Sequence, residues 1–456
     1  MEIQKLVAAQ RAFFRTGATR ELEFRKEALT SLKRAVQARE SALLAALRAD
    51  LGKSDAEGYL CEVGLTLEEL SFAERRLPRW ARERRVATPL ALFPARSTVF
   101  PEPYGVALIM SPWNYPLLLT LDPLIGAIAA GNCCVVKPSA YAPATSAALR
   151  ELVSGCFPPE YVAVVEGGRQ ENQALLDQEF DYIFFTGGVE VGRQVMEKAT
   201  KHLTPVTLEL GGKSPCVVDA TARLDLAAKR IAFGKLLNCG QTCVAPDYLL
   251  VDRRVKGELL DRLRYWTERM YGTDPLDNQG YVHMVNRKHF DRVCALIDPV
   301  KVVYGGQADP DTLRIQPTIL DGVSPEDPVM GEEIFGPLLP VLEFDDLSQA
   351  EHFILDRPRP LALYLFSEDK AVQRRFLRNI SFGGGCVNDT VLHLANPRLP
   401  FGGVGNSGLG RYHGAYSFET FSHTKGVLQT STRLDLPIRY PPYTGSREKW
   451  IRRFLK

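Results

Sequence analysis

The chain has 456 residues, of which 45% are hydrophobic and 24% charged, and its formal net charge is +2. This length exceeds what one compact core accommodates, so we expect two or three lobes, and the near-zero charge gives no electrostatic basis for binding nucleic acid or an anionic membrane. The odd number of cysteines, nine, does not suit a disulfide framework, and no signal segment opens the sequence, so we expect a cytoplasmic protein.

Apolar residues in the first third of the chain are spaced as in helices. From Leu22 to Leu51 they recur at about three, four and seven residues, which is the spacing of one helix face, and Gly52 is a natural stop. The apolar run from Leu117 to Val136 is predicted to be a buried helix and strand, with no membrane anchor, because breakers interrupt it. These breakers are Asp122, Pro123, Gly126, Gly131 and Asn132.

From about Tyr104 the pattern changes to short apolar strands alternating with helices, which predicts an α/β fold with a doubly wound parallel sheet. The expected strands are Val106–Met110, Cys133–Val136, Val162–Val165 and Tyr182–Phe185. The expected helices between them are Leu121–Ala130, Ala142–Ser154 and Gly192–His202. A second round is expected to start at Val206–Leu208 and Cys216–Val218 and to reach about Asn388. Beyond it the chain is turn-rich, and residues 439–443 are predicted to belong to an arm that could cross to another subunit.

One cysteine and one glutamate stand in contexts that favour chemistry. Cys243 lies on a turn opened by Gly240 and closed by Pro246, which presents a thiol, and Glu209 is an isolated carboxylate in a β-like run. Together they indicate covalent thiol catalysis with a carboxylate base nearby. The cysteine segment alone leaves a second interpretation open, in which Cys243 is an ordinary buried small hydrophobe.

Two strand-to-helix turns are candidates for holding a cofactor. The Gly187-Gly188 turn follows an expected strand and opens a helix, so its free backbone N–H groups suit a pyrophosphate. Lys137 ends another expected strand, at the edge where open α/β sheets bind ligands. Taken singly, each turn is explained equally well as a tight connection.

Three motifs resemble phosphate-binding sequences but lack the full pattern. Gly-Lys-Ser occurs at 52–54 and 212–214, yet a P-loop also requires an earlier glycine, where Leu47 and Thr207 stand. Residues 403–408 match GxGxxG but follow no clear strand, so we expect a loop near a pocket. The histidines show no paired spacing and the cysteines no CxxC, so we expect no metal site.

Dispersed motifs along nearly the whole chain resemble the aldehyde dehydrogenase superfamily, and within it the short class 3 branch. They are Pro-Trp-Asn-Tyr-Pro at 112–116, Lys-Pro-Ser at 137–139, Phe-Thr-Gly at 185–187, Leu-Glu-Leu-Gly-Gly-Lys-Ser at 208–214, Gly-Gln-Thr-Cys at 240–243, Glu-Ile-Phe-Gly-Pro at 333–337 and Pro-Phe-Gly-Gly at 400–403. The resemblance implies oxidation of an aldehyde to a carboxylate with NAD or NADP, through a thiohemiacetal and a thioester on Cys243. It also implies a homodimer.

The resemblance implies a role for each matching residue. Cys243 is similar to the nucleophile, Asn114 to the oxyanion donor and Glu209 to the base that activates water. The cofactor contacts implied are Lys137 at the adenosine ribose, Gly187 and Gly192 beneath the pyrophosphate, and Glu333 and Phe335 at the nicotinamide ribose and ring. The positions implied for the substrate pocket are Tyr115, Thr242 and Phe401.

Two features refine the expected specificity. Many relatives carry Glu after Lys-Pro-Ser, whereas Ala140 stands here. Its absence removes a repulsion of about 4 kcal/mol for unit charges ~4 Å apart at an effective dielectric near 20, so we expect NADP to be accepted alongside NAD or ahead of it. No arginine adjoins the motifs to hold a second carboxylate, so we expect medium-chain aliphatic or aromatic aldehydes.

The expected architecture is a Rossmann-like cofactor domain, a second α/β catalytic domain and a small oligomerisation arm. The expected ranges are 1–77 and 101–208 for the dinucleotide-binding domain, 209–392 for the catalytic domain, and 78–100 and 393–456 for the bridging segments. Three other functions remain as alternatives: an acyltransferase that uses Cys243, a CoA-acylating aldehyde dehydrogenase, and a non-catalytic protein on this scaffold. The presence of Glu209 argues against the first two, since neither needs a water-activating base.

Overall fold

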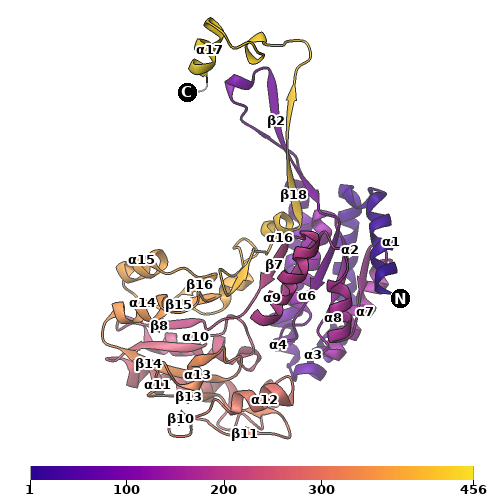
Figure 1. Cartoon of the computed structure of the whole chain (residues 1–456). Coiled ribbons are helices and arrows are strands. Elements are labelled where there is room, and N and C mark those ends of the chain that lie inside the picture. Colours follow the sequence, from indigo (N-terminus) through magenta and orange to yellow (C-terminus); the bar gives the residue numbers. More distant parts are fainter. Residues whose placement is uncertain (1, 455–456) are drawn as a thin grey trace.

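The computed structural model describes residues 2–454 and consists of two α/β lobes and a projecting arm (Figure 1). The N-terminal lobe is coloured indigo to magenta, and the second lobe is coloured pink to orange. The arm combines a purple segment with the yellow C-terminal segment. The α/β fold expected from the sequence is confirmed.

A six-stranded sheet forms the centre of the N-terminal lobe. Its strands, in spatial order, are β17 (Gly408–Leu409), β7 (Val206–Glu209), β6 (Tyr182–Thr186), β3 (Val106–Met110), β4 (Cys133–Lys137) and β5 (Val162–Val164). All neighbours are parallel except β17, which runs antiparallel to β7. Every residue of β3 and β4 is buried, as expected for strands covered on both faces. The four strands predicted here from the sequence are confirmed.

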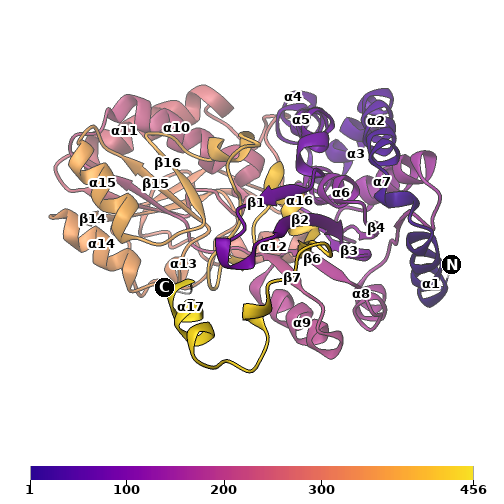
Figure 2. The same cartoon turned by 90° about the horizontal axis from the view of Figure 1, so that it is seen from above.

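Helices cover this sheet on both sides (Figure 2). They are α1 (Ile3–Arg15), α2 (Leu22–Ala38), α3 (Glu40–Leu51), α4 (Asp55–Gly58), α5 (Gly64–Trp80), α6 (Leu118–Ala130), α7 (Pro143–Cys156), α8 (Arg169–Leu176) and α9 (Val189–Ala199). The helical expectation for 22–51 is confirmed, with a break at Arg39. Helix α3 ends at Gly52, whose φ of 73° is readily adopted by glycine.

The second lobe has its own seven-stranded sheet. Its strands, in spatial order, are β10 (Val302–Tyr304), β13 (Thr318–Leu320), β14 (Leu338–Phe344), β9 (Tyr248–Asp252), β8 (Pro215–Val218), β15 (Ala362–Phe366) and β16 (Gly384–Val387). All neighbours are parallel except β10 and β13. A small ribbon of β11 (Ala308–Asp309) and β12 (Arg314–Ile315) is separate from this sheet.

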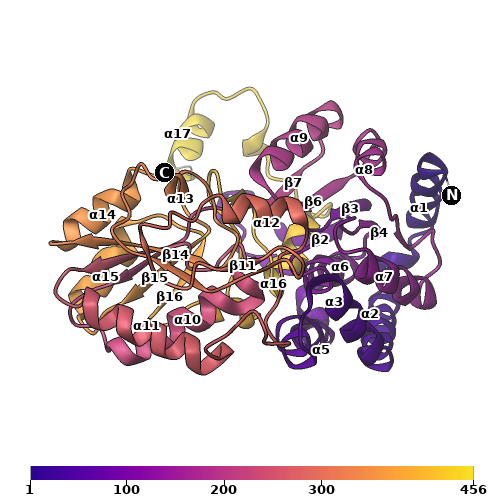
Figure 3. The same ribbon diagram turned by 90° about the horizontal axis from the view of Figure 1, so that it is seen from below.

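The helices of the second lobe follow from right-handed crossovers. They are α10 (Leu224–Leu236), α11 (Lys256–Tyr271), α12 (Arg287–Cys294), α13 (Pro328–Gly331), α14 (Leu347–Leu355) and α15 (Lys370–Asn379). Helices α10 and α11 pack side by side on one face of the sheet (Figure 3). Helices α14 and α15 lie on the other face, because their crossovers run in the opposite direction along the sheet.

Strand β7 belongs to the N-terminal sheet, so the expectation that it opens the second round is wrong. It pairs in parallel with β6, from Ile183–Val206 to Thr186–Glu209. The second sheet begins at β8, and residues 210–214 cross between the lobes. An apolar run before two glycines reads the same in either sheet, so only strand pairing decides this assignment.

The arm is a long antiparallel ribbon. Strands β2 (Ala95–Pro103) and β18 (Ser422–Thr430) pair residue for residue, and β1 (Arg84–Val86) adds a short third strand. Helix α17 (Ser446–Phe454) lies beyond the ribbon (Figure 1). Part of the expected bridging segment belongs instead to the N-terminal lobe, since β17 joins its sheet and α16 (Ala415–Thr420) contacts α6. The expected domain ranges remain a prediction.

Candidate active site

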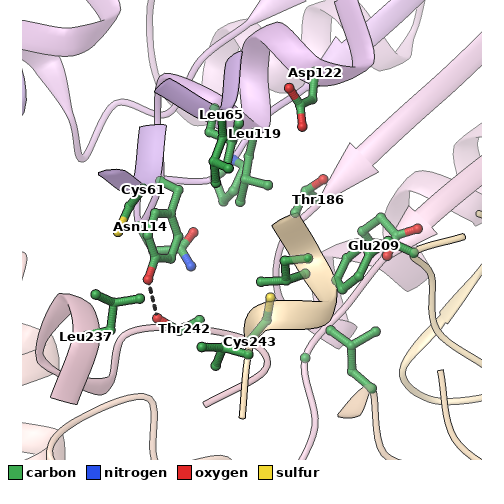
Figure 4. A pocket seen from close by; sticks show the side chains of 18 of the residues that line it. Cys61, Leu65, Asn114, Leu119, Asp122, Thr186, Glu209, Leu237, Thr242 and Cys243 are labelled. Carbon is green, nitrogen blue, oxygen red and sulfur yellow. Dashed lines mark hydrogen bonds between the residues drawn. The ribbon is translucent and has the colours of Figure 1, made fainter. Parts of the chain in front are cut away.

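A cavity of about 480 Å³ lies between the two lobes and is lined mainly by apolar side chains. Nine of the residues singled out in the sequence line it: Asn114, Tyr115, Gly187, Glu209, Thr242, Cys243, Glu333, Phe335 and Phe401. Figure 4 shows Cys243, Asn114 and Glu209 around the same pocket. Lys137 and Gly192 are outside its lining. The fold thus brings together motifs that are up to several hundred residues apart in the chain.

Cys243 is carried by a loop whose backbone is tightly fixed. After α10 the chain enters a short turn in which Asn238 and Cys239 adopt left-handed φ values of 53° and 55°. Gly240 follows with φ 71°, and a Cβ there would lie 2.3 Å from the carbonyl oxygen of Gly336. This close approach explains the glycine that opens the turn, as the sequence indicated.

Gln241 ties the same loop to the neighbouring segment. Its Nε2 donates to the carbonyl oxygen of His283 at 3.1 Å, and its Oε1 accepts from the N–H of Val285 at 3.0 Å. Because Gln241 is fully buried, these bonds are shielded from water. Cys243 itself is half-buried and lines the cavity, so its thiol can be reached from there.

Asn114 and Tyr115 contact this loop from the segment between β3 and α6. The Asn114 Nδ2 donates to the carbonyl oxygen of Gln241 at 3.0 Å. The Tyr115 hydroxyl and Thr242 Oγ1 are 2.6 Å apart, the hydrogen bond drawn in Figure 4. The side-chain amide of Asn114 has two N–H donors, so one remains for a ligand beside Cys243.

Electrostatics keep the Cys243 sulfur protonated. Burial raises the pKa of the thiol well above its usual range, and the nearby carboxyls of Glu333 and Glu209 raise it further. Because only the thiolate is a strong nucleophile, a proton acceptor or a cationic ligand must favour ionisation when the site reacts.

Glu209 is at the carboxyl end of β7, and its side chain is 2% exposed. Neither carboxyl oxygen accepts a hydrogen bond from residues 2–454, and burial raises the pKa of this carboxyl well above its usual range. Strand β17 closes one side, with Gly408 opposite Glu209. A Cβ on Gly402 would lie 3.2 Å from Glu209 Oε1. The carboxyl is therefore closely confined by its neighbours, while it still lines the cavity.

The N-terminus of α9 opens into the cavity at Gly187 and Gly188. A Cβ on Gly188 would meet nothing within 4 Å, which leaves room beside the free N–H groups of the first helical turn. Gly192 serves packing instead, because a Cβ there would lie 2.6 Å from Leu210 Cδ2. Lys137 is buried, and its Nζ donates to the carbonyl oxygens of Pro138 at 2.8 Å and Gly167 at 2.6 Å.

Glu333 and Phe335 are presented by a segment that Lys213 holds. Lys213 pairs with Asp247, and its Nζ also donates to the carbonyl oxygen of Glu332 at 2.8 Å. Burial, with a smaller contribution from Asp247, raises the pKa of Glu333 to about 8. Phe335 adopts φ 48° and packs edge-on to Trp113 at 5.3 Å between ring centres.

Comparison with known proteins shows which family the chain belongs to. The sequence profile described as "Aldehyde dehydrogenase family" matches residues 1–427. The chain belongs to the aldehyde dehydrogenase family. It is 48% identical to 4,4'-diaponeurosporen-aldehyde dehydrogenase of Staphylococcus aureus, over 98% of this chain and 97% of that protein. It is 45% identical to aldehyde dehydrogenase family 3 member H1 of Arabidopsis thaliana, over 99% of this chain and 94% of that protein.

A solved structure shares the whole fold. The substrate-bound state of Staphylococcus aureus AldH has a TM-score of 0.98 and 47% identity, and the match covers 100% of this chain and 99% of that one. This aldehyde dehydrogenase is therefore an oxidoreductase that oxidises an aldehyde with NAD or NADP, as the resemblance implied. The acyltransferase and CoA-acylating alternatives receive no support from these relatives.

Among the lining residues that the sequence did not single out as site residues are three buried ionisable side chains. Glu69 and Asp122 are buried carboxyls that line the dehydrogenase cavity, and Tyr412 is a buried phenol beside Phe401. Glu69 accepts from the N–H of Gly414 at 2.9 Å, whereas Asp122 Oδ1 has no partner in the described part of the chain. Burial raises the pKa of both carboxyls. An aspartate inside the apolar run 117–136 was the available signal.

Residues 2–454 contain neither a metal-binding cluster nor a membrane-spanning helix. No group of three His, Cys, Asp or Glu side chains there is arranged to bind a metal ion. No helix among these residues is both long enough and apolar enough to cross a bilayer.

Proposed function

We propose that this aldehyde dehydrogenase oxidises a medium-chain aliphatic or aromatic aldehyde, with Cys243 as nucleophile, Asn114 as oxyanion donor and Glu209 as base. The Cys243 sulfur adds to the aldehyde carbon, and its proton leaves to solvent or a nearby base. The oxygen of the adduct accepts hydrogen bonds from the Asn114 amide and the Cys243 backbone N–H. Loss of hydride from carbon leaves a thioester on the sulfur. Glu209 then removes a proton from water, which hydrolyses the thioester to carboxylate and free thiol.

One observation carries this proposal: a nucleophile, an amide donor and a buried carboxyl meet in one cavity that continues to the N-terminus of α9. That helix end fits a dinucleotide, because it combines free N–H groups with open space at Gly188. In this proposal Glu333 and Phe335 hold the nicotinamide ribose and ring. When bound there, NAD(P)⁺ would supply the hydride acceptor, and its positive charge would favour the thiolate form of Cys243.

The cofactor contacts proposed for Lys137 and Gly192 are more limited, because both residues are outside the cavity lining. The Lys137 ammonium is engaged by two backbone carbonyls, so contact with an adenosine ribose requires it to exchange at least one of these bonds. Gly192 supports the pyrophosphate turn indirectly, by allowing α9 to approach Leu210 closely.

The activity is tested with octanal and benzaldehyde, each with NAD and with NADP. The absence of reduced cofactor with every pair would contradict the proposal.

The substrate end of the cavity suits neutral, apolar aldehydes. Arg292 lines the cavity, but its guanidinium already donates to Glu332 Oε1 and to the carbonyl oxygen of Ile334. The buried Glu69 and Asp122 carboxyls add negative charge when they ionise. The Staphylococcus relative named for 4,4'-diaponeurosporen-aldehyde also supports an apolar substrate. Phe401, Thr242 and Tyr115 are the proposed pocket walls.

Discrimination against an anionic aldehyde is expected to increase with pH. Burial raises the pKa of Glu69 to about 7, so this carboxyl is neutral below that pH and repels anions above it. The ratio of kcat/KM for hexanal to that for adipate semialdehyde should rise about tenfold from acidic to alkaline conditions, as expected for charges ~10 Å apart at an effective dielectric near 20. Glu69→Gln should weaken the rise, whereas Glu27→Gln, which changes an exposed carboxyl of α2 outside the cavity lining, should not. A ratio that is independent of pH would refute the expectation.

NADP is expected to be used alongside NAD or ahead of it. Ala140 is exposed just beyond β4 and brings no carboxylate to repel a ribose phosphate. The kcat/KM values of the two cofactors should differ by less than about a hundredfold, and Ala140→Glu should lower the NADP value selectively by about tenfold or more. An NADP value more than a hundredfold below that for NAD would show that the carboxylate is not what determines the choice.

We also propose that two copies associate through the arm, whose ribbon exposes apolar side chains. They include Val86, Leu90, Phe93, Val427 and Leu428. Several exposed large apolar side chains on one projecting element are typical of an interaction surface. A single-chain mass by light scattering would contradict the dimer. A cytoplasmic location remains a prediction.

A further inference from the structure

The lysine of the first Gly-Lys-Ser triplet is buried behind the active site. Lys53 Nζ lies 2.5 Å from Glu62 Oε1, and both side chains have 0% exposure. The same Nζ donates to the main-chain carbonyl oxygen of Asn114 at 3.0 Å. A buried ion pair is costly to desolvate and is weak evidence for stability alone, so its contacts with an active-site residue indicate another role.

This ion pair fixes both ends of residues 114–118, which lead from the β3–α6 connection into α6. Glu62 Oε2 accepts from the N–H groups of Leu117 at 2.8 Å and Leu118 at 3.2 Å, where the start of α6 favours a carboxylate. At the other end, the Lys53 ammonium holds the Asn114 carbonyl and lies 4.1 Å from the centre of the Tyr115 ring. Residues 114–118 are therefore held by one ion pair from residues 53 and 62.

Two further bonds connect this segment to the cysteine loop. Asn238 Nδ2 donates to the Asn114 carbonyl oxygen at 2.9 Å, so this oxygen accepts two hydrogen bonds. The Asn114 Nδ2 in turn donates to the carbonyl oxygen of Gln241. A shift of the Asn114 main chain would therefore move its amide relative to Cys243.

We propose that Lys53, paired with Glu62, is a positioning residue for aldehyde oxidation. It fixes the Asn114 main chain so that the side-chain amide meets the oxygen of the Cys243 adduct. This inference rests on the proposed roles of Asn114 and Cys243. Fixed donors need no reorganisation during the reaction, and a displacement of about 1 Å can cost on the order of a hundredfold in rate.

The test replaces the pair as a unit, Lys53→Met with Glu62→Gln. Glutamine keeps an acceptor for the α6 N–H groups, and the double change leaves neither member of the ion pair charged without its partner. With hexanal, kcat/KM is expected to fall about 10- to 100-fold, while the KM for cofactor stays unchanged. The matched control is Lys33→Met with Glu74→Gln, which removes a 2.9 Å ion pair between α2 and α5. This control should keep kcat/KM within about twofold.

A double-mutant cycle with Asn114→Ala separates positioning from general stability. In that background, the change at Lys53 and Glu62 should lower kcat/KM by less than about twofold, because the donor it positions is gone. Equal falls in both backgrounds would overturn the inference and leave the proposed site intact. No loss from Asn114→Ala alone would overturn the proposed site, and the inference with it.

A second variant tests the positioning of the Asn114 main chain and leaves the Lys53–Glu62 ion pair unchanged. Asn238→Gly removes the other donor to the Asn114 carbonyl, together with the 3.1 Å bond from the same Nδ2 to the carbonyl oxygen of Gln241. Glycine readily adopts the φ of 53° at this position. Its kcat/KM should also fall, and Asn114→Ala should cancel that fall. A loss that persists in the Asn114→Ala background would count against the inference, even if the variants at Lys53 fail to fold.

Discussion

Replacing Cys243 with alanine is expected to abolish aldehyde oxidation while leaving cofactor binding intact. The proposed reaction passes through a covalent bond to this sulfur, so no partial route remains, and kcat should fall by more than about 10⁴-fold, as for other covalent nucleophiles. Reduced-cofactor formation measures the loss, and fluorescence titration measures cofactor binding. Cys61→Ala is the matched control, because Cys61 is a second cysteine that lines the same cavity.

The covalent step can be tested directly by mass spectrometry. The enzyme without substitutions, quenched during turnover, should carry an acyl group on the peptide that contains Cys243. The Cys61→Ala variant should carry the same adduct and keep most of its activity. Continued oxidation by Cys243→Ala, or an adduct on another cysteine, would show that hydride transfer does not depend on this sulfur.

Replacing Glu209 with glutamine is expected to stop the reaction after the first hydride transfer. Glutamine keeps the shape of the side chain but cannot take a proton from water, so the thioester should persist. A rapid burst of reduced cofactor should remain, followed by a steady rate lower by about 10²- to 10⁴-fold. Glu27→Gln is the matched control, since that carboxyl is exposed on α2 and is outside the cavity lining.

The pH dependence of deacylation follows from the environment of Glu209. Burial raises the pKa of this carboxyl well above its usual range, so the base is protonated at low pH and becomes active as pH rises. Steady-state turnover should therefore increase with pH until Glu209 is ionised, provided that deacylation limits the rate. The increase should be absent in Glu209→Gln. A variant that turns over at the unmodified rate, with the same pH profile, would place the base elsewhere.

Local sequence was sufficient to predict the strands, the turn before Cys243 and the catalytic motifs. Strands such as Val106–Met110 were predicted correctly because they are continuous apolar runs between turns. The turn before Cys243 was predicted because Gly240 supplies a positive φ beside a closely packed backbone. The motifs around Asn114, Glu209 and Cys243 identified the family, since short stretches of loop carry the chemistry.

Long-range packing decided what local sequence left open. Glu209 and Asn114 are far from Cys243 in the chain and meet only because parallel strands bring their carboxyl ends to one edge, facing the second lobe. Packing also decided that Lys137 and Gly192 are outside the cavity lining. Protonation states depend on packing too, because burial raises the pKa of Glu209 and of the Cys243 thiol.

The sequence by itself determined the family, the α/β pattern of strands and helices, and the residues able to perform the chemistry. The tertiary structure alone decided that β7 belongs to the N-terminal sheet, that Glu69 and Asp122 line the cavity, and that Lys53 holds Asn114. The physical reason is that residue type and spacing encode local conformation and reactivity. Desolvation, ion pairing and contact between lobes exist only when distant segments pack together.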